Sequence, residues 1–208
     1  EHDCRYCYAK TMAIRFKRAT ATSWITPHLR QHDVDRRYNK RDGRIMFPTA
    51  HDITPANLDL CLDVLARMLA AGNEVLIVSK PRVACVKRLC SGLLPYRAQI
   101  VFRFSIASTD NAVLSFWEPG APSFEERLEC LRLAHLSDYE TSVSCEPILD
   151  ANPDALVKAV RPFVTDAIWL GKINRLRNIL PLNCPSDTES VRRGEALMAT
   201  QNDTVIRA

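Results

Sequence analysis

The stretch Val75-Leu76-Ile77-Val78-Ser79-Lys80 is a continuous apolar run that stops at two polar residues. Such a run is typical of a parallel strand that is covered on both faces. Pro81 follows directly, and a helical pattern of apolar residues continues from there to Leu94. The stretch therefore predicts a strand and then a helix, with Ser79 and Lys80 at the carboxyl end of the strand.

Strand-like and helix-like segments alternate on both sides of this unit. We expect strands at 45–47, 99–106, 141–145 and 167–170, and helices at 54–72, 124–136, 153–161 and 188–200. Thr54 before Pro55 is one expected helix N-cap, and Ser123 with Glu126 three residues later is another. Strand–helix units in series favour a parallel sheet joined by right-handed crossovers. No glycine-rich fingerprint follows any strand, which argues against a dinucleotide-binding fold.

The bulk composition is that of an ordinary globular protein. The chain has 208 residues, enough for one domain with a substantial core, and 47% of them are hydrophobic. No apolar run approaches the roughly 18 residues of a membrane-spanning helix, so we expect no membrane partner. Five of the eight cysteines fall inside apolar patterns: Cys61, Cys85, Cys90, Cys130 and Cys145. We interpret them as buried thiols in a reducing compartment and expect a cytoplasmic protein.

Positive charge is concentrated near the start of the chain. Residues 10–44 contain ten lysines and arginines against three aspartates, a net charge of +7 in a chain whose total is +4. Within this segment, residues 19–43 show no clean periodicity and predict a long irregular connection. A basic segment with interspersed aromatic residues can follow a phosphate backbone, so it predicts a nucleic-acid partner. The alternative is a solvated loop that binds nothing.

The first ten residues are Glu1-His2-Asp3-Cys4-Arg5-Tyr6-Cys7-Tyr8-Ala9-Lys10. Two cysteines three residues apart occur in zinc sites, in redox sites and in iron–sulfur sites alike. A zinc site would need a second pair of ligands at short spacing, and no second Cys-x-x-Cys pair follows. A thioredoxin-like site normally comes directly after a strand, whereas only three residues precede Cys4 here. This context narrows the interpretation of Cys4 and Cys7 but does not by itself select one kind of site.

Polar residues follow all five predicted strands. They are Thr49, His51 and Asp52, then Ser79 and Lys80, then Ser105 and Ser108, then Cys145 and Glu146, then Lys172 and Asn174. In barrels built of strand–helix units the chemistry lies at the carboxyl ends of the strands. The set therefore predicts a functional site at that end of the sheet.

The loop from His2 to Ala9 resembles the cluster loop of the radical SAM superfamily, whose signature is Cys-x-x-x-Cys-x-x-Cys. It is most similar to the branch that contains spore photoproduct lyase, with Cys4 and Cys7 at the second and third cysteines. The first cysteine of that pattern would fall one residue before Glu1. Four further segments resemble the same branch: Ile77-Val78-Ser79-Lys80, Phe104-Ser105-Ile106, Trp117 to Leu128 (which begins Trp-Glu-Pro-Gly-Ala-Pro) and Glu146-Pro147-Ile148.

This resemblance implies a partial (β/α)6 TIM-like barrel of the radical SAM type, with its N-terminal strand before Glu1. Residues 1–208 would be a single core domain, divided into a cluster loop (1–10), an irregular basic segment (11–43) and strand–helix repeats (44–208). The implied cofactors are a [4Fe–4S] cluster and S-adenosyl-L-methionine (SAM). The implied partner is a reductant such as a ferredoxin or flavodoxin.

The resemblance also implies roles for individual residues. Cys4 and Cys7 would hold the cluster, and Lys80 would contact the SAM carboxylate. Ser105 and Glu146 would meet the ribose hydroxyls. Tyr6 would pack at the cluster and Tyr8 at the adenine.

The chain departs from photoproduct lyases at the end of the first strand it contains. Those enzymes carry a cysteine there, whereas this chain has Thr49-Ala50-His51-Asp52. We therefore expect a radical SAM enzyme with another substrate, nucleic acid among the candidates, in which His51 or Asp52 handles a proton. One alternative is a nucleic-acid-binding or regulatory barrel without a cluster. Another is a zinc- or redox-active α/β protein that uses Cys4 and Cys7.

Overall fold

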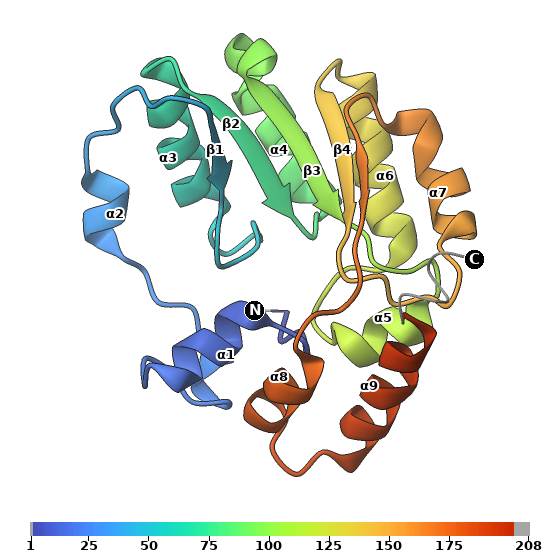
Figure 1. The fold of residues 1–208 in the computed structure, drawn as a ribbon. Coiled ribbons are helices and arrows are strands. Elements are labelled where there is room, and N and C mark those ends of the chain that lie inside the picture. The colour runs from blue at the N-terminus through green and yellow to red at the C-terminus, as the bar shows by residue number, and fades with distance from the viewer. Residues whose placement is uncertain (1, 202–208) are drawn as a thin grey trace.

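The computed structural model describes residues 2–201, and five parallel strands form its sheet (Figure 1). The strands are β1 (Arg44–Phe47), β2 (Glu74–Ser79), β3 (Ile100–Ser105), β4 (Glu140–Cys145) and β5 (Ile168–Leu170). They are hydrogen-bonded in sequence order, so each strand lies beside the next along the chain. This confirms the predicted α/β class with a parallel sheet, and the arrangement is consistent with a partial TIM-like barrel.

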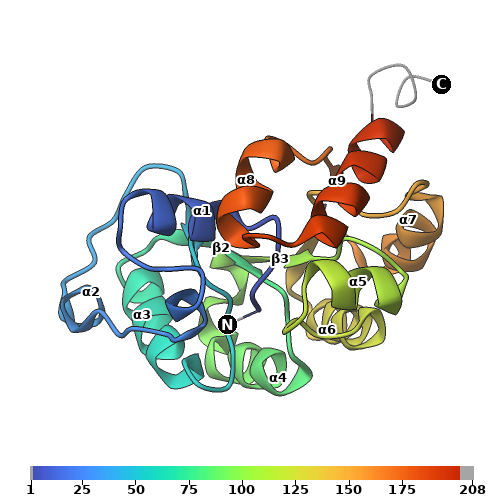
Figure 2. The same cartoon turned by 90° about the horizontal axis from the view of Figure 1, so that it is seen from below.

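Two layers of helices surround the sheet. One face is covered by α3 (Leu58–Ala70), α4 (Val83–Gly92), α6 (Phe124–Leu136) and α7 (Asp154–Val160). The second layer lies below the carboxyl ends of the strands and contains α1 (Tyr8–Arg15), α5 (Asn111–Trp117), α8 (Leu176–Asn183) and α9 (Thr188–Thr200). Figures 1 and 2 both show this second layer beneath the strand ends. The edge predicted to carry chemistry is therefore the one that the second layer covers.

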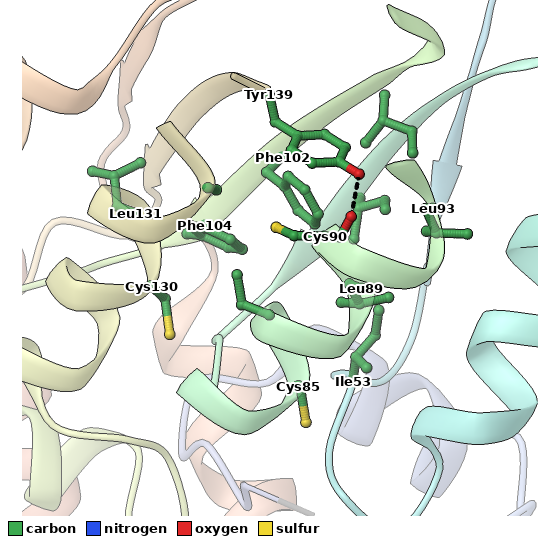
Figure 3. Close-up of a cluster of buried hydrophobic side chains, with 14 of the residues drawn as sticks. Ile53, Cys85, Leu89, Cys90, Leu93, Phe102, Phe104, Cys130, Leu131 and Tyr139 are labelled. Carbon is green, nitrogen blue, oxygen red and sulfur yellow. Dashed lines mark hydrogen bonds between the residues drawn. The ribbon is translucent and has the colours of Figure 1, made fainter. Parts of the chain in front are cut away.

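The main core lies between the sheet and the first helix layer. Alternate strand residues such as Ile77, Phe102 and Val143 point into it and are fully buried. Figure 3 shows Cys85 and Cys90 of α4 and Cys130 of α6 among these side chains. The Tyr139 hydroxyl donates a 2.8 Å hydrogen bond to the Cys90 carbonyl, which satisfies a polar group inside the core.

All eight cysteines are free thiols. The five that were expected to be buried are at most 6% exposed, which confirms their predicted burial. No helix in residues 2–201 is both long and apolar enough to cross a bilayer.

Several predicted boundaries were correct, and others were not. The Ser123 hydroxyl accepts from the Glu126 amide at 3.3 Å, so the predicted cap of α6 is confirmed. The predicted cap at Thr54 is wrong, because α3 begins at Leu58. Asn57 holds residues 52–57 in a turn by accepting from the Thr54 amide at 2.8 Å and donating to the Asp52 carbonyl at 2.9 Å. No helix was predicted at the positions of α5 and α8.

The basic N-terminal segment is largely irregular, as predicted. After α1 it contains a 3-10 turn (Ser23–Ile25) and the short helix α2 (Gln31–Asp35), and neither buries a side chain. Lys10 is different from the other basic residues, because it is 3% exposed and its ammonium lies 2.7 Å from Asp3. It belongs to the fold of the cysteine loop and is not part of an exposed basic surface.

Candidate active site at the carboxyl ends of the strands

The cysteine loop is a tight turn that starts α1. The Cys7 amide donates to the Cys4 carbonyl at 3.0 Å, which closes the turn. The Cys7 thiol then caps α1 by accepting from the Lys10 amide at 3.3 Å. Cys4 is 7% exposed and Cys7 is half-buried. The spacing of the two cysteines therefore follows from one turn and one helix start.

Lys80 lies between two carboxylates at the end of β2. Its ammonium is 4.0 Å from Asp52, which follows β1, and 4.0 Å from Glu118, which ends α5. Its side chain is only 14% exposed. Burial alone would lower the pKa of the ammonium, but the neighbouring Cys4, Asp52 and Glu118 raise it above its usual range. Lys80 is therefore a permanent cation at the strand ends.

Asp52 is held by three donors. Its carboxylate accepts from the Lys80 amide at 2.6 Å, from the Ser79 hydroxyl at 3.2 Å and from His2 Nδ1 at 2.9 Å. Burial would raise the pKa of this carboxyl, but Lys80 and the hydrogen bond from His2 hold it below its usual range. The carboxylate thus connects the loop after β1, the end of β2 and the cysteine loop.

Glu118 is a deeply buried charge of the site. It is 1% exposed, and its carboxylate accepts from Arg127 at 2.5 Å and from the Tyr6 hydroxyl. Arg127 is fully buried and also donates to the Pro122 carbonyl at 2.9 Å and the Ser105 carbonyl at 3.2 Å. Burial raises the pKa of Tyr6, and Glu118 raises it further, so the phenol stays a hydrogen-bond donor. This buried pair anchors the cysteine loop to the rest of the site.

Cys4 is surrounded by these charges. Burial raises the pKa of its thiol to about 12, Lys80 opposes the rise, and Glu118, Cys7 and Asp52 add to it. The thiol is therefore neutral near pH 7 as long as it binds nothing, and a metal ion would have to displace its proton.

The donor set fits two ligand positions of a [4Fe–4S] cluster. Cys4 and Cys7 are thiols on one loop, which is the ligand type that such clusters require. Within residues 2–201, no three His, Cys, Asp or Glu side chains are grouped so as to hold a metal ion. His2 is 5% exposed, and its Nε2 atom has no hydrogen-bond partner among the described residues. An imidazole nitrogen beside the cysteine loop is suited to contact a bound group.

Four other predicted site residues differ in their exposure and contacts. Tyr8 is on the surface of α1 and is 60% exposed. His51 is exposed, with its ring edge-on to Phe47 at 6.4 Å. Glu146 is exposed and accepts from the Ser144 hydroxyl at 3.0 Å. Ser105 is half-buried at the end of β3. The roles of these four residues stay predictions.

Sequence reasoning missed four members of the site. Glu118 and Arg127 lay inside the stretch from Trp117 to Leu128 but were given no role there. The sequence did offer one signal for them, because a glutamate precedes a proline-rich turn and an arginine follows nine residues later. His2 gave no signal, and neither did Asn183, whose side-chain amide donates to the Cys7 carbonyl at 2.9 Å. A single polar residue in a loop or at a helix end has many uses.

Comparisons with known proteins support the fold. No protein-family model matches the sequence. The chain is 27% identical over 163 residues to the uncharacterized protein ORF301 of Acidianus two-tailed virus, covering 73% of this chain and 54% of that protein. It is similar in structure to spore photoproduct lyase complexed with dinucleoside spore photoproduct, with a TM-score of 0.56 and 16% identity. That match covers 88% of this chain and 57% of the lyase. The chain thus spans about half the length of either protein and has a distant fold relationship to a radical SAM enzyme.

Proposed function

We propose that this chain is the core of a radical SAM enzyme that acts on an unidentified substrate. The observation that carries the proposal is the position of Cys4 of the Cys-x-x-Cys loop, buried beside the Lys80 ammonium at the carboxyl end of a parallel sheet. This combines the two residues that the resemblance assigns to the cluster and to the SAM carboxylate. The fold relationship to spore photoproduct lyase supports the same assignment.

A [4Fe–4S] cluster with SAM supplies, when bound, one-electron cleavage of the sulfonium and a 5′-deoxyadenosyl radical. Cys4 and Cys7 would bind the cluster as thiolates. Lys80 would neutralise and orient the SAM carboxylate by a charge-assisted hydrogen bond. Asp52 and Glu118 hold the ammonium from two sides, and Arg127 balances the charge of Glu118. The buried position of the loop would keep water away from the reacting atoms.

Anaerobic reconstitution tests the proposal directly. The full-length protein that carries this chain is loaded with iron and sulfide, reduced and examined by EPR with and without SAM. We expect a [4Fe–4S]+ signal that changes when SAM is added, together with release of 5′-deoxyadenosine. A protein that takes up no cluster under these conditions would overturn the proposal and favour the alternative of a cluster-less barrel.

Lys80→Met separates SAM binding from cluster binding. Loss of one charge-assisted hydrogen bond is worth about 1.5–3 kcal/mol, so SAM affinity should fall by about 10- to 100-fold. Iron content should stay at the wild-type level. Lys87→Ala, an exposed lysine on α4, is the matched control and should change neither quantity. Unchanged SAM affinity in Lys80→Met would show that Lys80 does not contact the carboxylate.

The remaining partners are also proposals. The protein would receive its electron from a ferredoxin or flavodoxin in the cytoplasm. Nucleic acid is the proposed substrate class, supported by the exposed arginines of the basic segment, including Arg36, Arg37 and Arg41. Because neutralised phosphates release counterions, DNA binding should fall steeply with salt. A salt-independent affinity would exclude this substrate class.

A further inference from the structure

Asn183 is the last residue of α8 and is 3% exposed. Its side-chain amide is aimed at the cysteine loop, more than 170 residues away in sequence. Nδ2 donates to the Arg5 carbonyl at 2.9 Å and to the Cys7 carbonyl at 2.9 Å. Oδ1 accepts from the Thr11 hydroxyl at 2.9 Å. Three of the four hydrogen bonds that an amide can make are thus used on this one loop.

The contacts determine which way the amide faces. The two carbonyl oxygens can only accept hydrogen bonds, so Nδ2 must face them. The Thr11 hydroxyl lies 3.1 Å from the Cys7 carbonyl as well, so it lies next to both the amide and the loop. Since the amide is buried away from water, loss of any of these hydrogen bonds would leave a polar group unsatisfied and would destabilise the folded protein.

The bonded carbonyls lie on either side of Tyr6 in the turn that contains both thiols. Cys4 and Cys7 are connected by the 3.0 Å bond from the Cys7 amide to the Cys4 carbonyl. Asn183 therefore restrains the backbone that sets the distance and direction between the two sulfur atoms.

A second attachment makes the same connection. The Arg5 guanidinium donates to Asp187, which caps α9, and to the Ser190 hydroxyl at 2.9 Å. It also donates to the Phe116 carbonyl at 2.7 Å and lies over the Phe116 ring. Figures 1 and 2 both show α8 beside α1, with α9 next to it. The two last helices described thus hold the loop from one side.

We propose that Asn183 is a positioning residue for the cluster ligands Cys4 and Cys7, acting through its hydrogen bonds to the carbonyls of residues 5 and 7. It does not touch the bound group itself. This inference rests on the proposed function for its meaning, although the restraint on the loop can be measured in the protein without a cluster.

The first test compares Asn183→Ala with Asn178→Ala in the full-length protein. Asn178 is an exposed residue of the same type on the same helix, which makes it a matched control. Cluster-free protein is treated with iodoacetamide, and the labelling rate of each cysteine is followed by peptide mass spectrometry. Labelling of Cys7 should be about 10-fold faster in Asn183→Ala, because local opening of the loop becomes easier. Cys130 in the core should label at the wild-type rate in both variants.

Two results decide this test. Faster labelling at Cys7 with an unchanged rate at Cys130 supports the proposal. A wild-type rate at Cys7 in Asn183→Ala overturns it. If Cys130 is also labelled faster, Asn183→Ala has lost its fold. The labelling rates of Thr11 variants then decide whether the proposal holds.

Thr11→Val removes the hydroxyl that bonds to Asn183, and Thr11→Ser retains it. Faster Cys7 labelling in the valine variant, with recovery in the serine variant, supports the proposal. Equal rates in the two variants overturn it.

Loading with iron and sulfide then connects the restraint to the cluster. If wild-type protein takes up iron, Asn183→Ala should take up less than half as much and Asn178→Ala the full amount. Full uptake by Asn183→Ala would overturn the positioning role. If wild-type protein takes up none, the proposed function fails, while the labelling rates still report whether Asn183 restrains the loop.

Discussion

Cys4 of the loop and the cysteines of the core are similarly buried but differ in their neighbours. Burial raises the pKa of Cys4 in the loop to about 12 and that of Cys90 in the core to about 11. Around Cys4 lie Lys80, Glu118 and Asp52, whereas Figure 3 shows Cys90 among leucine and aromatic side chains. The core thiols fill space, and the loop thiol belongs to a charged site.

This difference shows that burial does not decide what a cysteine does. A buried thiol is unreactive unless something replaces its proton, and a metal ion can do so. A metal ion can replace the thiol proton only where there is room for the ion and where nearby charges compensate its charge. The loop pair has a cation and two carboxylates nearby, and the core cysteines of α4 and α6 are packed into the main apolar cluster. Three predictions test how far this contrast holds.

The largest effect is expected from Cys4→Ala. Loss of one of the two thiolate ligands on this loop should abolish cluster uptake and 5′-deoxyadenosine formation, as measured by iron analysis and product assay. Cys130→Ala should leave both intact and lower the free energy of unfolding by about 1 kcal/mol through lost packing, as measured by urea unfolding. If Cys130→Ala failed to take up a cluster, the proposed difference between the loop cysteines and the core cysteines would be wrong.

A smaller but still large effect is expected from Arg127→Leu. The variant leaves the Glu118 charge buried without its main partner, which should lower the free energy of unfolding by about 3–5 kcal/mol. The double variant Glu118→Gln with Arg127→Leu should recover part of this loss. Arg132→Ala, an exposed arginine on the same helix, is the control and should change stability little. If Arg127→Leu and Arg132→Ala lowered the free energy of unfolding equally, the site would tolerate an unpaired Glu118 carboxylate.

The smallest effect concerns the pH dependence of stability. The pKa of Asp52 is lower in the folded protein, so its ionisation stabilises the fold above the unfolded pKa of about 3.9. This contribution is lost as the pH falls through the lowered folded pKa. Asp52→Asn should therefore lower the free energy of unfolding by about 1–2 kcal/mol at pH 7, and the difference should shrink below about pH 4.

Asp59→Asn provides the control for this pH series. Asp59 is an exposed residue on α3, and its replacement should change the free energy of unfolding only slightly. The measurement is urea unfolding from pH 3 to pH 7. The free energies of unfolding of Asp52→Asn and the wild-type protein are compared at each pH. A difference that stays constant over this range would show that ionised Asp52 does not stabilise the fold.

Much of the sheet could be predicted from the sequence because its signals are local. The run from Val75 to Val78 and the cap at Ser123 are read from adjacent residues, and both were correct. Helix α5 was missed because its seven residues show too little periodicity, although Asp110 caps it by accepting from the Ala112 amide at 2.7 Å. The start of α3 was misplaced because Asn57 uses its side chain to hold a turn in place of the expected helix start.

The candidate site was predictable only in part. Cys4, Cys7 and Lys80 were found because each follows a recognisable pattern, a short cysteine spacing or a strand end. The sequence alone thus determined the parallel strands, most of the helices and the edge of the sheet where the charged residues collect. Only the tertiary structure decided that Glu118 bonds to Tyr6 and that Asn183 bonds to the cysteine loop. Periodicity and capping depend on neighbours within a few residues, whereas these contacts join residues more than a hundred positions apart and form only when the helices pack.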